Sequence, residues 1–454
     1  MKKIACFVLA VIQLLLLTAC AGDFPLTDLL NPTEPQDTIV YAYPSEIPTF
    51  DEDKVLPIIA FWSPPNTEEW YQSMVDCGFT DVIIDGKYGV TPGSEKMFET
   101  LGICDKIGLG AYIAVGRGYR FTTDLRYGQY ESFKGINTDE PLTKAQIDII
   151  IENIESLKNV FPDAEFWLGL AFGYPGDFAS ADALFDYYMT NGGTQQEAFS
   201  LAPYPLYGHE GEYTLNSMWL SWLEDVAGYA QKYGTNAYSY MAAMSIRSQK
   251  SRRPDTDDFR FTSYVPLAFG IKGLGHFCYT TPGTPPYAGE FAEEDYALIN
   301  FTNENDFSTY YKTELWDKVK TVNEELKGMD QAILSFDWQG IMKSIGTDAQ
   351  TGAGRNCFLN VKKWMHKHDG IKTFTSTEDT LMGVFKNDDG YDGFMLVNFA
   401  DPAYDRENTV TITFRGATCA MIYIDGEPQM VDLVDGTYTV TLEPGEGQFI
   451  IPLN

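Results

Sequence analysis

The chain of 454 residues is poor in the residue types that build metal and redox sites. It has only four histidines, and the His366-Lys367-His368 run lacks the companions that a zinc site needs. Five cysteines follow residue 20, an odd and scattered set without a Cys-x-x-Cys pair, which argues against a disulfide framework or a metal ribbon. We therefore expect neither a metal nor a cofactor in the functional site.

Positive charge is also scarce. Lysine and arginine total 32 against 64 acidic residues, which gives a net charge of −32. A surface this acidic repels phosphate backbones and anionic polysaccharides, so we expect no nucleic-acid partner and a neutral ligand. The sequence has no Gly-x-Ser-x-Gly elbow, which leaves little support for an esterase, and the charge disfavours a lyase acting on acidic glycans.

Long apolar runs are confined to the N-terminus. Lys2 and Lys3 precede the apolar run of residues 4–17, so residues 1–20 are predicted to be a signal peptide. The sequence Leu17-Thr18-Ala19-Cys20 resembles the lipobox of bacterial lipoproteins, which implies lipidation of Cys20; the alternative is an ordinary secretory signal with a chance cysteine. We expect a protein of the bacterial cell envelope, outside the cytoplasm, anchored only through this lipid. Residues 21–50, rich in Pro, Thr and Asp, are predicted to be a flexible tether.

Residues 55–282, within a domain predicted to span 51–345, repeat one pattern eight times: a short apolar run, a loop and an amphipathic helix. This predicts an α/β fold, a (β/α)8 TIM barrel. An open doubly wound sheet is the main alternative, but the chain has no Gly-rich phosphate loop. The expected strands are 56–62, 81–85, 109–116, 133–139, 165–172, 199–204, 236–241 and 275–279, and a last helix is expected over 304–333.

The pattern changes near the C-terminus. After a connection at 346–380, residues 381–454 alternate apolar and polar positions between Asp-Gly pairs, which predicts a small all-β sandwich. The segment 387–392 (Asn-Asp-Asp-Gly-Tyr-Asp) has the composition of a calcium loop. It lacks the downstream glutamate that such a loop requires, so a hairpin turn is favoured.

The most informative motif is Thr138-Asp139-Glu140-Pro141, at the end of the predicted fourth strand. Proline cannot continue the strand, so Glu140 is expected at the strand tip. Catalytic side chains of such barrels lie at this rim. A carboxylic acid held there can protonate a glycosidic oxygen, so Glu140 is predicted to be a general acid/base. Asp139, which alternation turns to the opposite face, is predicted to orient the site.

Four segments together resemble bacterial glycoside-hydrolase-like barrels that are distantly related to clan A glycoside hydrolases and family-42 β-galactosidases. The resemblance implies a glutamate acid/base at position 140 and a β-sandwich after the barrel. It also implies a second carboxylate on the seventh strand, yet residues 236–244 contain none, and Ala202 stands where relatives commonly place an aspartate on the sixth strand. The segments that carry the resemblance are 57–65 with 70–79, 138–141, 259–279 and 440–449.

Other residues near the rim are weaker candidates. Asp85 and Glu210 follow the second and sixth strands and are candidate second carboxylates; the alternatives are a loop cap beside Gly86 and a solvated acidic loop. Arg247, after the seventh strand, is a candidate for binding substrate. Aromatic rings stack on the apolar faces of sugars, and the candidates by position are Trp62, Tyr112, Tyr204, Tyr207, Tyr240 and Tyr279.

Two functions remain open. The first is a glycoside hydrolase that cleaves O-glycosyl bonds of neutral glycans or oligosaccharides, with Glu140 as general acid/base. The second is a non-catalytic, surface glycan-binding lipoprotein on a glycosidase barrel that has lost its nucleophile, since a fold does not by itself imply an activity.

Overall fold

The computed structural model describes residues 41–170, 176–193, 198–208, 212–246, 250–282, 295–347 and 352–454, without the side chains of 352–354. The predicted signal peptide, Cys20 and most of the predicted tether lie outside these ranges, as do Glu210 and Arg247. None of the helices in the described ranges combines the length and the apolar character needed to cross a membrane.

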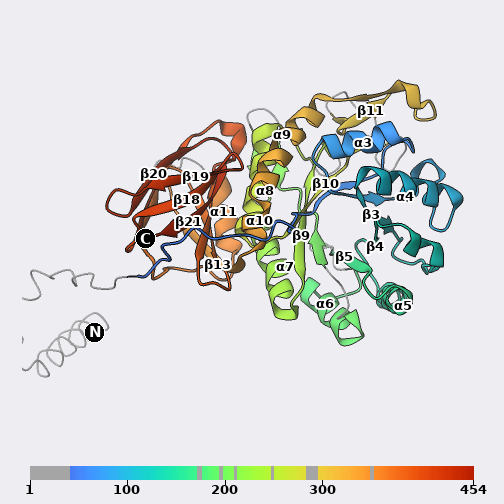
Figure 1. The fold of residues 1–454 in the computed structure, drawn as a ribbon, viewed down its shortest axis with the longest axis horizontal. Helices are drawn as coiled ribbons and strands as arrows, with labels where there is room; N and C mark the ends of the chain where they lie inside the picture. The colour runs from blue at the N-terminus through green and yellow to red at the C-terminus, as the bar shows by residue number, and fades with distance from the viewer. Residues whose placement is uncertain are drawn as a thin grey trace, which may run out of the picture. The chain divides into compact units, whose positions relative to one another are not determined.

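The first part of the chain forms a closed barrel of eight parallel strands, which confirms the TIM-barrel prediction (Figure 1). Each strand pairs with its neighbours in chain order, and the last strand closes on the first. All eight predicted strands are found, most of them one to three residues shorter than expected at an end. The barrel strands are β1 (Ile58–Phe61), β2 (Asp81–Ile84), β3 (Gly110–Ala114), β4 (Phe133–Thr138), β5 (Glu165–Leu170), β6 (Ala198–Leu201), β9 (Asn236–Ala242) and β10 (Gly273–Phe277).

The helices around the barrel begin where side chains cap their free N–H groups. The longest, α5, begins with a capping box in which Thr143 and Gln146 each accept from the other's backbone N–H. The predicted last helix is wrong at its start: residues 304–312 include a short 3₁₀ turn that Asp306 caps and strand β12 (Tyr310–Lys312), and the helix follows as α9. The helices are α3 (Glu68–Asp76), α4 (Glu95–Ile107), α5 (Lys144–Val160), α6 (Ala181–Thr190), α7 (Trp219–Tyr233), α8 (Thr256–Ala268), α9 (Glu314–Gly328) and α10 (Asp330–Leu334).

The barrel interior is packed in layers of four residues taken from alternate strands, as in other barrels of this kind. One layer consists of Ile59, Tyr112, Trp167 and Tyr238, which belong to one buried cluster. The Trp167 ring lies 5.4 Å from Tyr112 and 5.3 Å from Tyr238. The strand registers therefore fix which residues share each layer up to the C-terminal mouth of the barrel.

The C-terminal part forms two antiparallel sheets, which confirms the predicted β-sandwich. One has six strands in the order β13-β15-β16-β21-β18-β19 and the other three, β14-β17-β20. β13 and β14 lie within the ranges that the sequence assigns to the barrel and the connection. The strands are β13 (Asp337–Ser344), β14 (Ile371–Ser376), β15 (Thr380–Lys386), β16 (Asp392–Asn398), β17 (Asn408–Phe414), β18 (Cys419–Ile424), β19 (Glu427–Asp432), β20 (Thr437–Leu442) and β21 (Gly447–Leu453).

Tight turns set the register of these sheets. Asp425 and Gly426 have φ values of 49° and 81°, the double left-handed conformation of a two-residue hairpin turn. Residues 387–391 turn between β15 and β16, where Lys386 pairs with Asp392, so the hairpin interpretation of this segment is confirmed.

The second domain packs closely on helix α8. A Cβ added to Gly445 (φ 72°) would overlap the carbonyl oxygen of Asp257, so only glycine permits this approach. Nearby, buried Arg252 forms ion pairs with Asp258 of the helix and, at 2.7 Å, with Asp401 of the C-terminal domain. These contacts hold the loop after β16 against the barrel.

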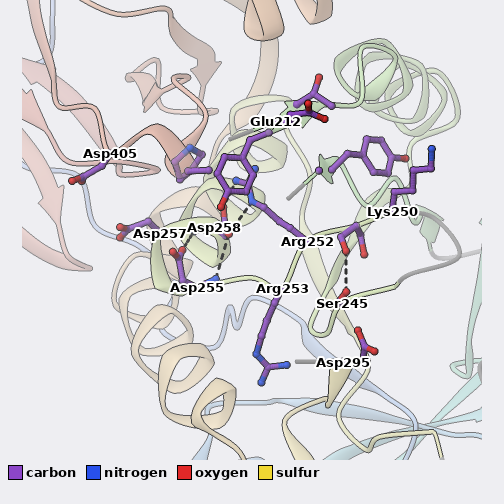
Figure 2. A pocket seen from close by; sticks show the side chains of 17 residues that line it. Glu212, Ser245, Lys250, Arg252, Arg253, Asp255, Asp257, Asp258, Asp295 and Asp405 are labelled. Atoms are coloured by element: carbon purple, nitrogen blue, oxygen red, sulfur yellow. Dashed lines mark hydrogen bonds and ion pairs between the residues drawn. The ribbon is translucent and has the colours of Figure 1, made fainter. Parts of the chain in front are cut away.

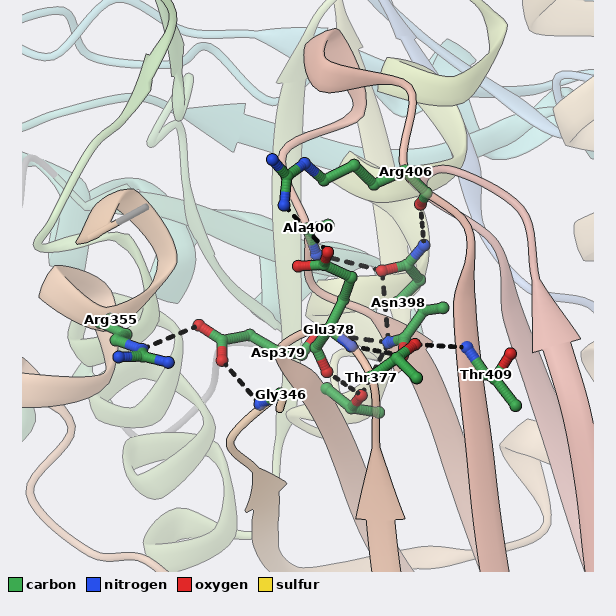
Figure 3. Close-up of polar contacts among 11 residues, drawn as sticks. Gly346, Arg355, Thr377, Glu378, Asp379, Asn398, Ala400, Arg406 and Thr409 are labelled. Atoms are coloured by element: carbon green, nitrogen blue, oxygen red, sulfur yellow. Dashed lines mark hydrogen bonds and ion pairs between the residues drawn. The ribbon is translucent and has the colours of Figure 1, made fainter. Parts of the chain in front are cut away.

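A buried asparagine stabilises that same loop from the side of the sandwich (Figure 3). Asn398 Nδ2 donates to the carbonyl oxygens of Arg406 (2.9 Å) and Glu443 (3.0 Å), and its Oδ1 accepts from Ala400 N (3.1 Å). Arg406 Nη1 in turn donates to Glu378 Oε1 at 2.9 Å. Both ends of loop 399–407 are thus fixed by hydrogen bonds within the sandwich.

Part of the predicted tether is docked on the C-terminal sheets. Tyr43 is buried, its hydroxyl donates to the carbonyl of Gly370 at 2.7 Å, and its ring lies 6.2 Å from Phe414. Asn454 N donates to Pro44 O at 2.9 Å, so the last residue is bonded to the same segment.

Candidate active site

The uppermost layer of the barrel contains two carboxylates. Ile83 and Asn137 point inward on β2 and β4, and residues two positions further along a strand point the same way. Continued by one residue past β2, β4 and β6, the registers place Asp85, Asp139 and Ala202 in one layer with Phe277, the last residue of β10, at the C-terminal mouth. Two neighbouring members of this ring are acids.

The placement of Asp139 is fixed by β5. Glu140 N donates to Gly169 O at 3.1 Å, which continues the β4–β5 pairing past Thr138. A Cβ added to Gly169 would overlap Asp139 Oδ1, so the carboxylate occupies the space that any other residue would fill. The side chain therefore points into the mouth, where it remains exposed to solvent.

Although solvent reaches the Asp139 side chain, the surrounding protein atoms remove part of the hydration of its carboxylate, and this desolvation together with the charge of Glu140 raises its pKa to about 7. The charge of Arg117 opposes this shift only in part. Below it lies Tyr240, whose buried hydroxyl has no hydrogen-bond partner among the described residues. The pKa of Tyr240 is raised well above its usual value, first by burial and then by the charge of Asp139.

Glu140 stands at the tip of β4, as the sequence predicts. Its backbone is left-handed (φ 46°), and its carbonyl oxygen accepts from Arg117 Nη1. Its side chain is partly exposed, and no described residue forms a hydrogen bond with the carboxylate. Its role as general acid/base stays a prediction.

Asp85 lies in the same layer and is held by its neighbours. Ser63 Oγ donates to Asp85 Oδ1 at 3.1 Å, and Lys87 N approaches the same oxygen at 3.4 Å. Burial raises the pKa of this carboxyl, and the charge of Lys87 lowers it in part. Asp85 therefore caps the loop after β2, as expected, and its carboxyl also belongs to the mouth layer.

Lys87 is a site residue that the sequence reasoning missed. Its ammonium is buried without a hydrogen-bond partner among the described residues and lies 4.9 Å from the centre of the Trp62 ring. A buried ammonium without a hydrogen bond is unfavourable in free energy, so a polar ligand that accepts from it would be bound favourably. The available signal was Asp85-Gly86-Lys87, a turn that leaves the second strand at the rim.

Aromatic rings form one wall of the mouth. Trp62 is partly exposed, and its ring lies 5.1 Å from that of Phe277, which in turn lies 5.8 Å from Tyr204. Trp62, Glu140 and Tyr204 all follow barrel strands with positive φ values of 66°, 46° and 36°. Left-handed non-glycine residues are uncommon and cluster at functional sites, so their gathering at this rim is consistent with such a site. Phe277 was not predicted.

Three predicted sugar contacts are corrected by the structure. Tyr112 is buried deep in the barrel, in the layer of Ile59 and Trp167, and donates to Glu165. Tyr240 is 5% exposed beneath Asp139. Tyr279 is fully buried on the outer side, where its hydroxyl contacts Ser73 (3.1 Å) and Trp316 (3.3 Å). Apolar burial outweighs rim position for each of these rings.

Tyr207 lies beyond the mouth, on the wall of a separate cavity. The described residues include no group of three or more His, Cys, Asp or Glu side chains arranged to hold a metal ion.

No protein-family model and no curated protein matches the chain. Among solved structures, it is similar to an Anoxybacillus α-amylase (9% identity, 88% of this chain and 98% of that one, TM-score 0.49). It is also similar to a family-27 β-L-arabinopyranosidase from Geobacillus stearothermophilus (10% identity, 88% of this chain and 97% of that one, TM-score 0.48). A third similar structure is that of a family-51 α-L-arabinofuranosidase from Bifidobacterium longum (10% identity, 92% of this chain and 98% of that one, TM-score 0.42). At such identities and TM-scores, none of these activities transfers to this chain.

Proposed function

We propose that this protein is a glycoside hydrolase in which Asp139 is the proton donor and Asp85 the second carboxylate. The observation that carries the proposal is the shared mouth layer, which turns both carboxyls inward beside the aromatic wall of Trp62, Tyr204 and Phe277. An acid and a base on either side of a sugar bound against aromatic rings are what glycosidic cleavage requires.

The raised pKa of Asp139 suits it for the acid. A general acid works best when its pKa is near the operating pH, and a value of about 7 leaves much of the group protonated at neutral pH. Asp139 gives its proton to the glycosidic oxygen as the bond to the anomeric carbon breaks, and the bonding electrons leave with that oxygen. Asp85 takes a proton from the attacking water, whose oxygen forms the new bond to carbon.

The strand geometry favours inversion. Asp85 and Asp139 stand on strands separated by β3, and two spacings of about 4.8 Å place their backbones about 10 Å apart. Side chains that point toward the barrel axis reduce this toward the roughly 6.5–9.5 Å of inverting enzymes rather than the roughly 5 Å of retaining ones.

Assay of the purified protein on a panel of neutral nitrophenyl glycosides and oligosaccharides tests the proposal. Asp139→Asn and Asp85→Asn are each expected to abolish most turnover, and NMR of the first product is expected to show an inverted anomer. If Glu140→Gln alone removes activity while Asp139→Asn retains it, Glu140 is the acid and the assignment of Asp139 is refuted. Binding of a glycan without any hydrolysis would instead support the alternative of a glycan-binding lipoprotein.

A further inference from the structure

A cavity of about 1320 Å³ lies between the barrel and the C-terminal domain (Figure 2). Its lining includes residues 207–208 and 212–214 after β6, Ser245 and residues 250–253 after β9, and Pro402, Ala403 and Asp405 from the sandwich. Cavities that hold drug-sized ligands are roughly 300–1,000 Å³, so this groove has room for several sugar rings.

The walls of the groove are built into the fold. Gly208 N donates to Lys250 O (3.1 Å) and Arg252 N to Leu206 O (3.1 Å), which ties the segment after β6 to the segment after β9. Ser245 Oγ donates to the carbonyl oxygen of Ser251 at 3.0 Å. The sandwich wall belongs to loop 399–407, which the Asn398 network and the Arg252–Asp401 ion pair hold in place.

The groove begins where the wall of the mouth ends. Tyr204 and Met244 belong to the buried cluster that fills the barrel interior, and both follow the C-terminal ends of barrel strands. Tyr207 and Ser245, three residues and one residue further along the same two segments, line the groove. A chain that leaves the mouth past Tyr204 therefore meets Tyr207.

The chemistry of the groove favours neutral sugars. Tyr207 is half-buried, and its hydroxyl accepts from Asn216 Nδ2 at 3.3 Å, which fixes its ring. Arg252 is neutralised by its two aspartates, and Arg253 pairs with Glu314 at 2.6 Å. Carboxylates accept hydrogen bonds from hydroxyl groups and repel anionic sugars. The lining acids are Glu212, Asp255, Asp257, Asp258, Asp295 and Asp405, against the cations Lys250, Arg252 and Arg253.

We propose that this groove is a distal subsite that binds the rest of a neutral oligosaccharide whose end occupies the barrel mouth, with the Tyr207 ring as its stacking platform. The proposal rests on the proposed function for the direction of the chain, and it makes the substrate an oligosaccharide or polysaccharide rather than a small glycoside.

Calorimetric titration of the full-length Asp139→Asn variant tests the subsite without turnover. The probes are neutral hexasaccharides and disaccharides of α-1,4-glucan, β-1,4-glucan, β-1,4-mannan and β-1,4-xylan, with hexagalacturonate as the anionic control. We expect one neutral hexasaccharide to bind more tightly than its disaccharide, and hexagalacturonate not to bind. Adding Tyr207→Ala is expected to lower the hexasaccharide-to-disaccharide affinity ratio about tenfold, the value of one good stacking contact.

Two matched variants separate stacking from folding. Tyr207→Phe keeps the ring and is expected to retain the affinity ratio. Tyr130→Ala removes a half-buried tyrosine that precedes β4, at the opposite end of the barrel, and is expected to leave the ratio unchanged.

The outcomes distinguish the subsite from the reaction. If no neutral hexasaccharide binds more tightly than its disaccharide, or if Tyr207→Ala leaves the ratio unchanged, the subsite is refuted even when the wild-type protein hydrolyses glycosides. If the wild type has no hydrolytic activity while Tyr207-dependent binding is observed, the proposed reaction fails and the binding groove stands.

Discussion

Replacing Asp139 by asparagine tests the environment of this carboxyl through stability as well as activity. Folding shifts its pKa from 3.8 to about 7, a difference of about 3 pH units. At about 1.36 kcal/mol per unit the full penalty for the ionised group would be about 4 kcal/mol. The side chain is exposed, so solvent screening reduces the expected value to about 1–2 kcal/mol.

The sign follows from proton binding. A carboxyl with a raised pKa binds its proton more tightly in the folded state, so its favourable contribution is complete below about pH 4 and is lost as the pH rises through about 7. Asparagine does not ionise, so Asp139→Asn removes the loss of stability at high pH. The variant is therefore expected to be more stable than the wild type at pH 8 by about 1–2 kcal/mol and nearly equal to it at pH 4.5.

Urea unfolding at pH 4.5 and pH 8, followed by tryptophan fluorescence, measures this difference. Asp163→Asn, at an exposed aspartate before β5, is the matched control and is expected to show no such pH dependence. The same Asp139→Asn protein is expected to lose about 10²- to 10⁴-fold in kcat with little change in KM. A variant that is less stable than the wild type at pH 8, or equally stable at both pH values, would refute the proposed environment of Asp139.

Three further substitutions address the site and its support. Gly169→Ala is expected to lower kcat at least tenfold while leaving the far-UV circular dichroism unchanged, because the new methyl group displaces the Asp139 carboxylate; an unchanged kcat would contradict the geometry. Lys87→Met is expected to raise KM more than it lowers kcat if its buried ammonium binds a substrate oxygen, and steady-state kinetics with the best glycoside would show it. Arg252→Met leaves two buried aspartates unpaired and is expected to cost about 3–5 kcal/mol in the free energy of unfolding, measured by urea denaturation at pH 7; a loss below about 1 kcal/mol would show that the ion pairs are not needed.

The sequence was sufficient for the architecture because the signals are local. Apolar runs of strand length, helix-capping residues such as Thr143 and Asp-Gly turns such as Asp425-Gly426 determine local structure within a few residues. Eight repeats of one pattern then leave few topologies other than a barrel. The start of the last helix was mispredicted because residues 304–312, although polar and amphipathic, contain a 3₁₀ turn at Phe307–Thr309 and a strand at Tyr310–Lys312, which pairs with residues 299–301.

The site was predicted only in part, because the tertiary structure decides which side chains face one another across the barrel. The sequence placed Asp85, Asp139 and Glu140 at strand ends, and alternation predicted only that Asp139 and Glu140 point to opposite faces. The registers of β2, β3 and β4 decided instead that Asp85 and Asp139 share one inward layer. A one-residue change in register would turn either carboxyl out of the mouth.

Burial likewise separated aromatic residues that look alike in the sequence. Trp62 and Tyr204 remain at the rim, whereas Tyr279, also near a strand end, packs outward between Ser73 and Trp316. Tyr207 lines a cavity whose other wall comes from the C-terminal domain, more than 190 residues away along the chain. No local sequence pattern predicts such a contact. The sequence by itself determined the strands, the turns and the acids at the strand ends, because these depend on neighbours in the chain. Which of those acids and rings face one another was decided only by strand register and domain packing, because these bring together residues that are distant in the chain.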